Sequence, residues 1–457
     1  MSAYTNQPIL VAGLGATGLS LVRYLSSQGA RVTVTDTRAA PPGLAQLQKE
    51  FPQIPLRLGR NDPGLLEGIE HLALSPGVDL RLPFIIEAQQ RGLPLWGDIE
   101  FFARAIKARP QAQVVGITGS NGKSTVTTLL GEMARVAGKS VAVGGNLGTP
   151  ALDLLREDAE IYLFELSSFQ LELTQTFACT AAVCLNVSAD HIDRHGSLEH
   201  YRALKLAIYR NARVAVTNAD DSLAQPQLRV DQSNKAFGLG TPAGDAYGLI
   251  EEAGARWLAQ DHEKILPLAA LRIYGLHNAA NALAALALGD ALGLSRAAMV
   301  KALRDFGGLP HRCQWVAEVA HVNYYNDSKG TNVGATLAAM AGLPVPVVLL
   351  AGGQAKGGDF KPWRPLLKEK GRALVLFGED APLIARAVGD AVAQYQVGSM
   401  REAVQQAAAV ARPGDAVLLS PGCASFDMFQ GYADRGAQFS AEVARLGAAP
   451  QRQGVRA

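Results

Sequence analysis

Short apolar runs alternate with amphipathic stretches along most of the chain, and this pattern predicts strands joined by helices. The first run, Ile9–Ala12, precedes a helix-like stretch to Gln28 and a β-branched strand at Arg31–Thr35. Strands of about 4–8 residues that alternate with helices are typical of mainly parallel sheets with crossover connections. A further strand and loop at 72–78 supports a Rossmann-like unit at the N-terminal end.

The same alternation continues through the rest of the chain. Strands are predicted at 113–118, 141–143, 161–165, 181–186, 213–217, 345–350, 373–377 and 416–419, with helices at 126–134, 201–209 and 277–292. Gly307, Gly308 and Pro310 interrupt the pattern and predict a domain boundary. We therefore expect an α/β protein of three domains: a Rossmann-like N-terminal domain (1–98), a central P-loop ATPase-like domain with a mainly parallel sheet (99–308) and a C-terminal dinucleotide-fold-like domain (309–457).

Composition narrows the functional classes. The 457 residues agree with about three domains. A net charge of +2, without a long block of Lys and Arg, argues against nucleic acid as a partner. The longest apolar stretches, 282–288 and 341–351, are too short to cross a bilayer, and the polar N-terminus indicates no signal peptide. The four cysteines lack metal-ligand spacing, so we expect buried free thiols in a cytoplasmic protein without membrane insertion.

The stretch 116–125, Gly-Ile-Thr-Gly-Ser-Asn-Gly-Lys-Ser-Thr, lies where a strand should end and a helix begin. Glycines let such a turn direct backbone N–H groups at phosphate oxygens, and the helix N-terminus adds positive charge. Lys123 would neutralise phosphate, and the Ser124 hydroxyl could bind Mg²⁺. The spacing is a variant of the Walker motif, because Ile117 stands where that motif has its first glycine. Chemistry on a nucleoside triphosphate is the resulting hypothesis.

A second glycine-rich turn, at 13–18, has the G-x-G-x-x-G spacing and is followed by Asp36. A turn of this kind between a strand and a helix, with a later acidic residue, is the dinucleotide fingerprint. A nicotinamide-dependent dehydrogenase is therefore an alternative hypothesis. The physics of the turn, however, requires only a diphosphate at the helix N-terminus.

Polar residues follow two strands of the middle region. Glu165 ends the strand 161–165, where a magnesium ligand of a phosphate site is expected. Asp190 and His191 follow the strand 181–186, and either could reach a metal ion or a phosphate because the ends of parallel strands share one edge. Lys205 lies within an amphipathic helix, and its periodicity alone gives it no special role.

Further polar clusters follow breaks in the pattern. Asn278 and Asn281 lie three residues apart at the start of an apolar helix. Asn278 can cap the helix, whereas Asn281 has less structural reason to be there and could bind a base or ribose. The clusters His311-Arg312 and 326–332 are either surface loops or ligand contacts.

Taken together, these motifs resemble the Mur ligase family over the whole chain. The resemblance rests on motifs in a shared order: Gly-Ser-Asn-Gly-Lys-Ser-Thr at 119–125, Glu-Leu-Ser-Ser-Phe-Gln at 165–170, Asp190-His191-x-Asp193, the helix start at 277–281, Pro-His-Arg at 310–312 and Asn-Asp-Ser-Lys at 326–329. Four further motifs resemble the members that add D-glutamate: 75–77, 97–100, 145–148 and 420–427. The Asp-Asn-Pro motif of the relatives that add diaminopimelate or lysine does not occur.

The resemblance implies an ATP-dependent acid–amino-acid ligase of peptidoglycan precursor synthesis. It would join D-glutamate to UDP-N-acetylmuramoyl-L-alanine through an acyl phosphate. The resemblance also implies a monomer in the cytoplasm. Another Mur-type ligase or a folylpolyglutamate-type amide ligase is the nearer alternative, and the dehydrogenase is the more distant one.

The resemblance also assigns roles to residues. Lys123, His191 and Lys205 would be catalytic, with two Mg²⁺ ions as cofactors. Ser124 and Glu165 would hold one ion, His191 would help to hold the second, and Lys205, carbamylated by CO2, would be a further ligand. Nucleotide contacts are implied for Gly119, Ser120, Asn121, Gly122, Lys123, Ser124, Thr125, Asn281, Arg312, Asp327 and Lys329.

Substrate contacts are implied in two places. The N-terminal domain would bind the UDP end, and residues nearer the sugar and peptide would complete the set: Ala16, Thr17, Thr37, Arg38, Ser75, Asn146 and His191. D-glutamate would contact Thr331, Lys356, Ser425, Phe426 and Tyr432. Tyr432 stands where the family commonly has phenylalanine.

Overall fold

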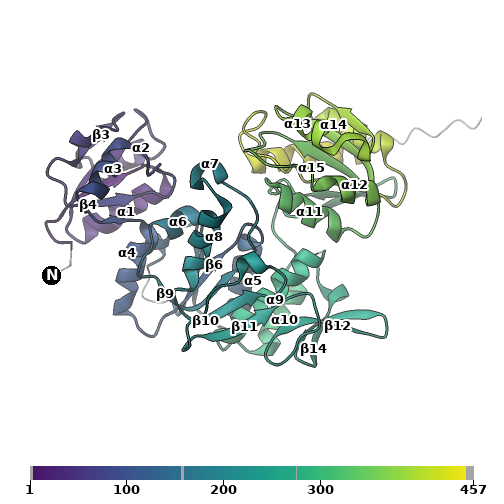
Figure 1. Ribbon diagram of the computed structural model, residues 1–457, viewed down its shortest axis with the longest axis horizontal. Coiled ribbons are helices and arrows are strands. Elements are labelled where there is room, and N and C mark those ends of the chain that lie inside the picture. Colours follow the sequence, from purple (N-terminus) through teal and green to yellow (C-terminus); the bar gives the residue numbers. More distant parts are fainter. Residues whose placement is uncertain (1–3, 156–158, 274, 449–457) are drawn as a thin grey trace, which may run out of the picture.

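Three β-sheets, each flanked by helices, follow one another along the chain in a computed structural model (Figure 1). The structure describes residues 4–155, 159–273 and 275–448. The sheets span 8–96, 113–267 and 314–419, which confirms the predicted three-part α/β architecture. The domain boundaries at 98/99 and 308/309 stay predictions.

The first sheet is entirely parallel, with strand order β3-β2-β1-β4-β5. The order reverses between β1 and β4, and such a switch point leaves a crevice at the carboxyl ends of the strands. The elements of this unit are β1 (Pro8–Ala12), α1 (Ala16–Ser27), β2 (Arg31–Asp36), α2 (Leu44–Glu50), β3 (Leu56–Leu58), β4 (His71–Leu74), α3 (Pro83–Gln90) and β5 (Leu95–Trp96).

The second sheet has nine strands in the order β14-β13-β12-β11-β10-β9-β6-β8-β7, and only the β12-β13-β14 pairings are antiparallel. The carboxyl ends of β6, β8, β9 and β10 therefore lie side by side. The elements are α4 (Asp98–Ala105), β6 (Gln113–Thr118), α5 (Lys123–Val136), β7 (Val141–Gly145), β8 (Ile161–Glu165), α6 (Ser168–Glu172), β9 (Ala178–Cys184), α7 (Ile192–His195), α8 (Leu198–Leu206), β10 (Asn211–Asn218), β11 (Ser233–Phe237), β12 (Tyr247–Glu252), β13 (Ala255–Gln260), β14 (Glu263–Pro267), α9 (Leu276–Ala291) and α10 (Arg296–Asp305).

The third sheet has the order β15-β16-β20-β17-β18-β19, with the β15-β16 pairing antiparallel and the others parallel. Its elements are β15 (Gln314–Val319), β16 (Val322–Asn326), α11 (Val333–Gly342), β17 (Val347–Gly352), α12 (Trp363–Lys370), β18 (Gly371–Phe377), α13 (Ala381–Val388), β19 (Gln394–Gln396), α14 (Met400–Val410), β20 (Ala416–Leu419) and α15 (Tyr432–Ala448). Within the described ranges, no helix is long and apolar enough to cross a membrane.

The two junctions between units differ in character. One continuous apolar core runs from the first sheet through α4 into the second sheet and includes Val11, Phe101, Phe102 and Phe164. The third unit has cores of its own on the two faces of its sheet. It contacts the second unit where α11 meets α9 and through polar side chains near the start of α5.

Some elements differ from the prediction. The helix expected at 201–209 is α8, which begins at Leu198, ends at Leu206 and is followed by a 3₁₀ turn. The strands β11 to β14 were not predicted. They alternate less clearly than the buried strands because they are only partly buried, as in β13 and β14.

Candidate active site

The loop between β6 and α5 is shaped by two glycines in the left-handed region. Gly119 has φ 145° and Gly122 has φ 84°, and α5 begins at Lys123. A Cβ atom at Gly122 would lie 2.4 Å from the amide oxygen of Asn281, so only glycine permits this contact. The predicted change from strand to loop to helix is thus present, and the loop turns its backbone toward the start of α9.

Lys123 is held by its own loop. Its ammonium donates to the carbonyl oxygens of Gly119 (2.9 Å) and Ser120 (3.0 Å). Burial lowers the pKa of Lys123, while the charge of Glu165 opposes that shift. The carbonyl groups position the ammonium at the mouth of the turn, where anionic oxygens would be stronger acceptors.

Ser124 and Glu165 form the centre of a short hydrogen-bond chain. The Ser124 hydroxyl donates to Glu165 Oε2 at 2.5 Å, and the Asn146 amide donates to Glu165 Oε1 at 2.6 Å. Arg312, from the start of the third unit, donates to the Ser124 hydroxyl oxygen at 2.6 Å. Burial alone would raise the pKa of Glu165, but the charge of Lys123 and the two hydrogen bonds lower it. Glu165 is therefore a buried carboxylate that stays ionised at neutral pH.

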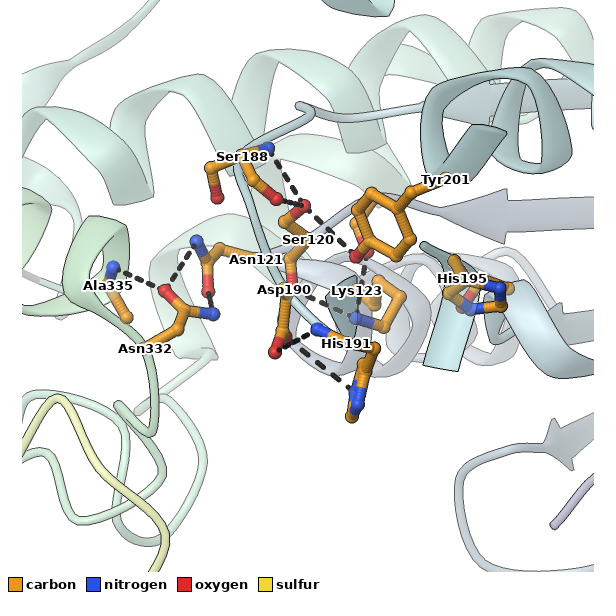
Figure 2. Close-up of polar contacts among 12 residues, drawn as sticks. Ser120, Asn121, Lys123, Ser188, Asp190, His191, His195, Tyr201, Asn332 and Ala335 are labelled. Carbon is orange, nitrogen blue, oxygen red and sulfur yellow. Dashed lines mark hydrogen bonds and ion pairs between the residues drawn. The ribbon is translucent and has the colours of Figure 1, made fainter. Parts of the chain in front are cut away.

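A second group of polar residues fixes the loop to the segment after β9 (Figure 2). The Ser120 hydroxyl donates to the Ser188 carbonyl at 3.0 Å and accepts from the Ser188 N–H at 3.0 Å. The Tyr201 hydroxyl lies 3.2 Å from the same Ser120 oxygen. Asn121 donates its backbone N–H to the Asn186 side chain at 2.8 Å. The loop and the residues that follow β9 therefore form one rigid wall.

Asp190 and His191 follow this wall. His191 has φ 55° and immediately precedes α7, and its Nε2 lies 3.8 Å from Asp190 Oδ2 (Figure 2). Burial lowers the pKa of His191, Asp190 partly offsets this, and the positive charge of Lys356 adds to it. The imidazole is therefore neutral at pH 7 and available as a ligand, and Lys356 of the third unit acts on it electrostatically.

Lys205 is the buried cation of α8. Its side chain is 1% exposed, its Nζ donates to the Gly119 carbonyl at 2.8 Å, and the Tyr201 ring lies 4.6 Å away. Burial, with the nearby charge of Lys123, lowers the pKa of Lys205 to about 7. Helix periodicity did not indicate this environment, because a single buried polar residue leaves an amphipathic pattern intact.

A cavity of about 330 Å³ lies between the second and third units beside this group. Of the residues predicted to contact the nucleotide, Asn121, Gly122, Thr125, Asn281, Arg312, Asp327 and Lys329 line it. Gly119, Ser120, Lys123 and Ser124 lie outside the lining and are joined to it through the contacts above. Asn186, Asn218 and Asp221 also line the cavity and were not predicted. Asn186 follows β9, Asn218 ends β10 and Asp221 follows β10, so the rule that identified Glu165 could have found them.

Asp327 is buried against the third sheet at the edge of this cavity. Its carboxylate accepts from the Ser420 hydroxyl at 2.7 Å and from the Cys313 N–H at 3.1 Å. Burial raises its pKa to about 6, although these hydrogen bonds oppose the shift. A carboxylate of the third unit, Asp327, and an amide of the second unit, Asn281, thus line the same cavity.

A larger cavity, of about 650 Å³, opens at the switch point of the first sheet. Six residues predicted to bind substrate line it: Ala16, Thr17, Thr37, Arg38, Ser75 and Asn146. Asp36 accepts a two-pronged contact from Arg38 (2.8 Å each) and the N–H of Leu14 at 2.8 Å. Both oxygens of the Asp36 carboxylate therefore already accept hydrogen bonds from the protein. This argues against Asp36 being the acidic residue that binds the ribose in a dehydrogenase. Arg60, Asp79 and Gln170 line the cavity too and were not predicted.

The residues predicted to bind D-glutamate line neither of the two cavities described above. Thr331 is half-buried, Lys356 is exposed with φ 49°, Ser425 is 2% exposed and Phe426 is 72% exposed. Tyr432 places its ring 3.8 Å from the Lys329 ammonium.

Sequence reasoning also missed Arg435 of α15. It is fully buried, donates to both oxygens of Ser328 (2.9 and 2.8 Å) and to the Cys423 carbonyl (3.2 Å), and so joins the two loops that carry Thr331 and Ser425. A single arginine in an amphipathic helix gives no sequence signal.

The fold and this arrangement define an α/β protein with a glycine-rich loop between a strand and a helix, a buried carboxylate beside that loop, and a cavity lined by residues of the second and third units. Three family profiles match the chain in order: "Mur ligase MurD-like, N-terminal domain" at 7–97, "Mur ligase middle domain" at 117–289 and "Mur ligase, glutamate ligase domain" at 311–423. The chain belongs to the Mur ligase family.

Curated relatives match nearly the whole chain. A UDP-N-acetylmuramoylalanine–D-glutamate ligase of Pseudomonas fluorescens is 52% identical over 441 residues, which cover 96% of this chain and 98% of the relative. Ligases of the same name from Nitrosococcus oceani and Pseudomonas aeruginosa are each 51% identical and cover 96% of this chain, with 96% and 98% of their own lengths matched.

Solved structures share the fold at lower identity. MurF from Acinetobacter baumannii has a TM-score of 0.60 at 18% identity, covering 98% of this chain and 92% of its own. MurF from Thermotoga maritima, solved in complex with ADP, has a TM-score of 0.58 at 17% identity, covering 97% and 96%. This likeness concerns the fold.

Proposed function

We propose that this chain is the ATP-dependent ligase that adds D-glutamate to UDP-N-acetylmuramoyl-L-alanine in peptidoglycan precursor synthesis. The observation that carries the proposal is the identity of about half of all residues, over nearly the full length, to curated ligases of that name. The phosphate loop, the ionised Glu165 and the two cavities supply the parts that such a reaction needs.

The chemistry requires that a carboxylate be converted into an acyl donor. An oxygen of the L-alanine carboxylate attacks the γ-phosphorus of ATP, and ADP leaves to give an acyl phosphate. The amine of D-glutamate then attacks the acyl carbon, phosphate leaves, and the nitrogen loses a proton. Several anionic groups must meet, so positive charge and oriented N–H groups are the main catalytic requirement.

The smaller cavity is the proposed nucleotide site. Lys123 and the loop N–H groups would face the phosphates, and Arg312 would approach from the third unit. Asn281 and Asp327 would contact the base and ribose at the other end of the cavity, with Lys329 near the reacting phosphates. The loop residues Gly119, Ser120, Asn121, Gly122 and Thr125 would shape and cap the phosphate contacts.

The donor atoms near the loop fit magnesium. Mg²⁺ prefers oxygen ligands, and the Ser124 hydroxyl and Glu165 carboxylate lie 2.5 Å apart. When bound, Mg²⁺ would neutralise charge on the phosphates. His191 would contribute at a second position, on the side of the loop that faces Lys356.

Lys205 is the proposed carbamate-forming lysine. An amine must be neutral to react with CO2, and a pKa of about 7 leaves much of this buried amine neutral at physiological pH. The product carries a carboxylate-like group, which can bind a metal ion. We expect Lys205→Ala to lose most activity and to be partly rescued by a short carboxylic acid, measured as phosphate release. An unaffected variant would rule the role out.

The larger cavity is the proposed site for the UDP end of the acceptor. Ala16, Thr17, Thr37, Arg38 and Ser75 lie at its wall, and Asn146 reaches from this wall to Glu165. The peptide arm would therefore extend from the first unit toward the phosphate loop. D-glutamate would enter from the third unit, near Thr331, Lys356, Ser425, Phe426 and Tyr432, and Arg435 holds the loops of that region.

An amino-acid screen tests the proposal directly. Purified protein is supplied with ATP, Mg²⁺ and UDP-N-acetylmuramoyl-L-alanine, and phosphate release is followed with D-glutamate, L-glutamate, L-lysine or meso-diaminopimelate. We expect release with D-glutamate and dependence on both substrates. Equal release with L-glutamate would contradict the assignment, and turnover with a pteroylglutamate acceptor would favour the folylpolyglutamate alternative.

Two further properties belong to the proposal. We expect a monomer, and light scattering after gel filtration tests this expectation. We also expect a cytoplasmic enzyme, because ATP and UDP-linked precursors are cytoplasmic substrates. Saturable binding of NADH, measured by nucleotide fluorescence, would instead support the dehydrogenase alternative.

A further inference from the structure

Three side chains that the reaction does not use form a cluster next to α7. Glu172 ends α6, His195 ends α7 and His200 lies in α8. One carboxylate oxygen of Glu172 and one ring nitrogen of each histidine all lie within 4.8 Å of one another. Figure 2 shows the His195 ring apart from the Asp190–His191 pair, and the Phe169 ring lies 5.1 Å from each of the two histidine rings.

The state of His195 points to a ligand. Its side chain is 7% exposed, and its Nε2 lies 3.0 Å from the Ser168 hydroxyl. Its Nδ1 is buried and has no hydrogen-bond partner among the residues that the structure describes, which is unusual because buried polar atoms are nearly always paired. Burial lowers the pKa of His195 to about 4, so the ring is neutral at pH 7. With Nε2–H donating to Ser168, the lone pair of Nδ1 is left free.

That arrangement is the one that histidine ligands adopt. A metal-binding histidine normally donates its other N–H to a neighbouring acceptor, which fixes the ring orientation and the tautomer. Here Ser168 would be that acceptor. The Phe169 ring stacks on His195, with centroids 5.1 Å apart, and further restricts the imidazole.

The ligand set selects the kind of ion. Two imidazole nitrogens and one carboxylate oxygen suit Zn²⁺ and similar transition-metal ions, whereas Mg²⁺ prefers oxygen alone. Two ligand atoms on one zinc ion are at most about 4.2 Å apart, because each bond is about 2.0–2.1 Å long. The half-buried Glu172 and the exposed His200 need to move by only about 1 Å to meet this limit.

We propose that Glu172, His195 and His200 form a binding site for a divalent transition-metal ion, of which zinc is the best fit, with water completing the coordination. Arg194 donates to Glu172 Oε2 at 3.2 Å, and we therefore assign the metal contact to the other carboxylate oxygen. The ion would link α6, α7 and α8, and it would thereby stabilise the segment that carries His191 at one end and Lys205 at the other. The proposal does not depend on which amino acid the enzyme adds.

Zinc titration of the untagged, chelator-treated protein tests this site. Millimolar Mg²⁺ is present throughout, so that it occupies the proposed magnesium sites of the reaction and zinc does not bind there. We expect one Zn²⁺ to bind by calorimetry, and Co²⁺ to give visible absorption bands at the same stoichiometry. His200→Ala should weaken binding about tenfold or more without loss of folding, because His200 is exposed. His195→Ala should do the same, and Zn²⁺ should raise the melting temperature of the wild type but not that of either of these two variants.

Two control variants distinguish this site from others. His262→Ala removes a histidine whose side chain is 86% exposed in the turn between β13 and β14, and it should bind Zn²⁺ like the wild type. His191→Ala should also retain the bound ion. The proposal is overturned if the wild type binds no zinc, if His200→Ala binds as tightly as the wild type, or if binding is lost in His191→Ala and kept in His200→Ala.

Discussion

The two glycine-rich turns of the molecule share the same backbone arrangement, a turn between a strand and the N-terminus of a helix, and they differ in the charges around it. Each joins the first strand of its sheet to a following helix, β1 to α1 and β6 to α5. In the first turn, the nearby ionised group is Asp36, which is held by Arg38 and the Leu14 N–H. In the second, two lysines donate to the same Gly119 carbonyl, and an ionised carboxylate lies beside them.

This difference in charge distinguishes a turn that can only bind a phosphate from one that could also support a reaction at it. Glycines let a backbone approach a phosphate closely, and a helix N-terminus attracts an anion, so either turn can bind a diphosphate. Only the turn at 116–125 adds buried positive charge and a pair of neighbouring oxygen donors, Ser124 and Glu165, which we propose are suited to a phosphoryl group in reaction. The fingerprint at 13–18 alone therefore suggested a dinucleotide, although the surroundings of Asp36 do not support one.

The largest effect is expected from removal of the charge at the second turn. Lys123→Ala should lower the ligase rate by about 10²–10³, as is typical when one stabilising donor of a transition state is lost. The fold should remain, because the lysine contacts only carbonyl groups of its own loop. Phosphate release and circular dichroism are the measurements. Lys139→Ala, which removes an exposed lysine paired with Glu160 just after α5, is the matched control and should retain full activity.

The geometry of the first turn can be broken without any change in charge. A Cβ atom at Gly18 would lie 1.9 Å from the Gly13 carbonyl oxygen, whereas one at Gly15 would meet nothing within 4 Å. We expect Gly18→Ala to lower the free energy of unfolding by about 1–3 kcal/mol, the usual cost of overpacking. Gly15→Ala should change it by less than about 0.5 kcal/mol. Chemical denaturation compares the two, and equal stability would show that the turn can relax.

These turns also show what the sequence can predict. The order of strands and helices, both glycine turns and the position of Glu165 follow from local patterns, because glycine, β-branched residues and strand ends act over a few residues. The burial of Lys205 and Arg435 does not follow, since it depends on which distant segments pack against α8 and α15. The engagement of Asp36 by Arg38 likewise needs the turn in three dimensions.

The missed edge strands have a different cause. The strands β11 to β14 extend the second sheet beyond its buried centre, where one face is exposed and the hydrophobic pattern is weak. The cavity residues Asn218 and Asp221 lie at the end of β10, which pairs with β11, and β10 was itself predicted.

Lys205 of α8, the second lysine that donates to the Gly119 carbonyl, should produce a pH dependence of stability. Lys205 titrates near pH 7 in the folded protein and at its ordinary value of 10.5 when unfolded. Between these values the unfolded chain binds more protons, so the free energy of unfolding should rise with pH and become flat below about 7. Between pH 7 and 8.5 this contribution is about 1–2 kcal/mol.

Lys205→Met isolates that contribution. Denaturant unfolding of the wild type and the variant is compared in buffers purged of CO2, so that no carbamate forms. The difference between the two curves should increase with pH as described. Parallel curves from pH 6 to 9 would mean that the buried ammonium is stabilised by its contacts with Gly119 and Tyr201 more than it is destabilised by burial.

The smallest effect is expected from the charge pair at the first turn, because Arg38 is 55% exposed. Arg38→Ala should lower the free energy of unfolding by less than about 1 kcal/mol. It should raise the KM for the UDP substrate severalfold and leave kcat unchanged, because Arg38 lines the larger cavity and lies away from the phosphate loop. Burial opposes ionisation of Asp36, yet the contacts with Arg38 and Leu14 lower its pKa to about 2, so its contribution to stability is present above about pH 3.8 and is lost toward pH 2.

Arg81→Ala is a closely matched control for this variant. Arg81 contacts Asp79, two residues earlier, with the same pair of side-chain hydrogen bonds that Arg38 makes to Asp36, but it does not line the cavity. Steady-state kinetics should show an unchanged KM for Arg81→Ala. If both variants raise KM equally, the effect comes from the overall positive field of the first unit, and the contact of Arg38 with the substrate is not specific.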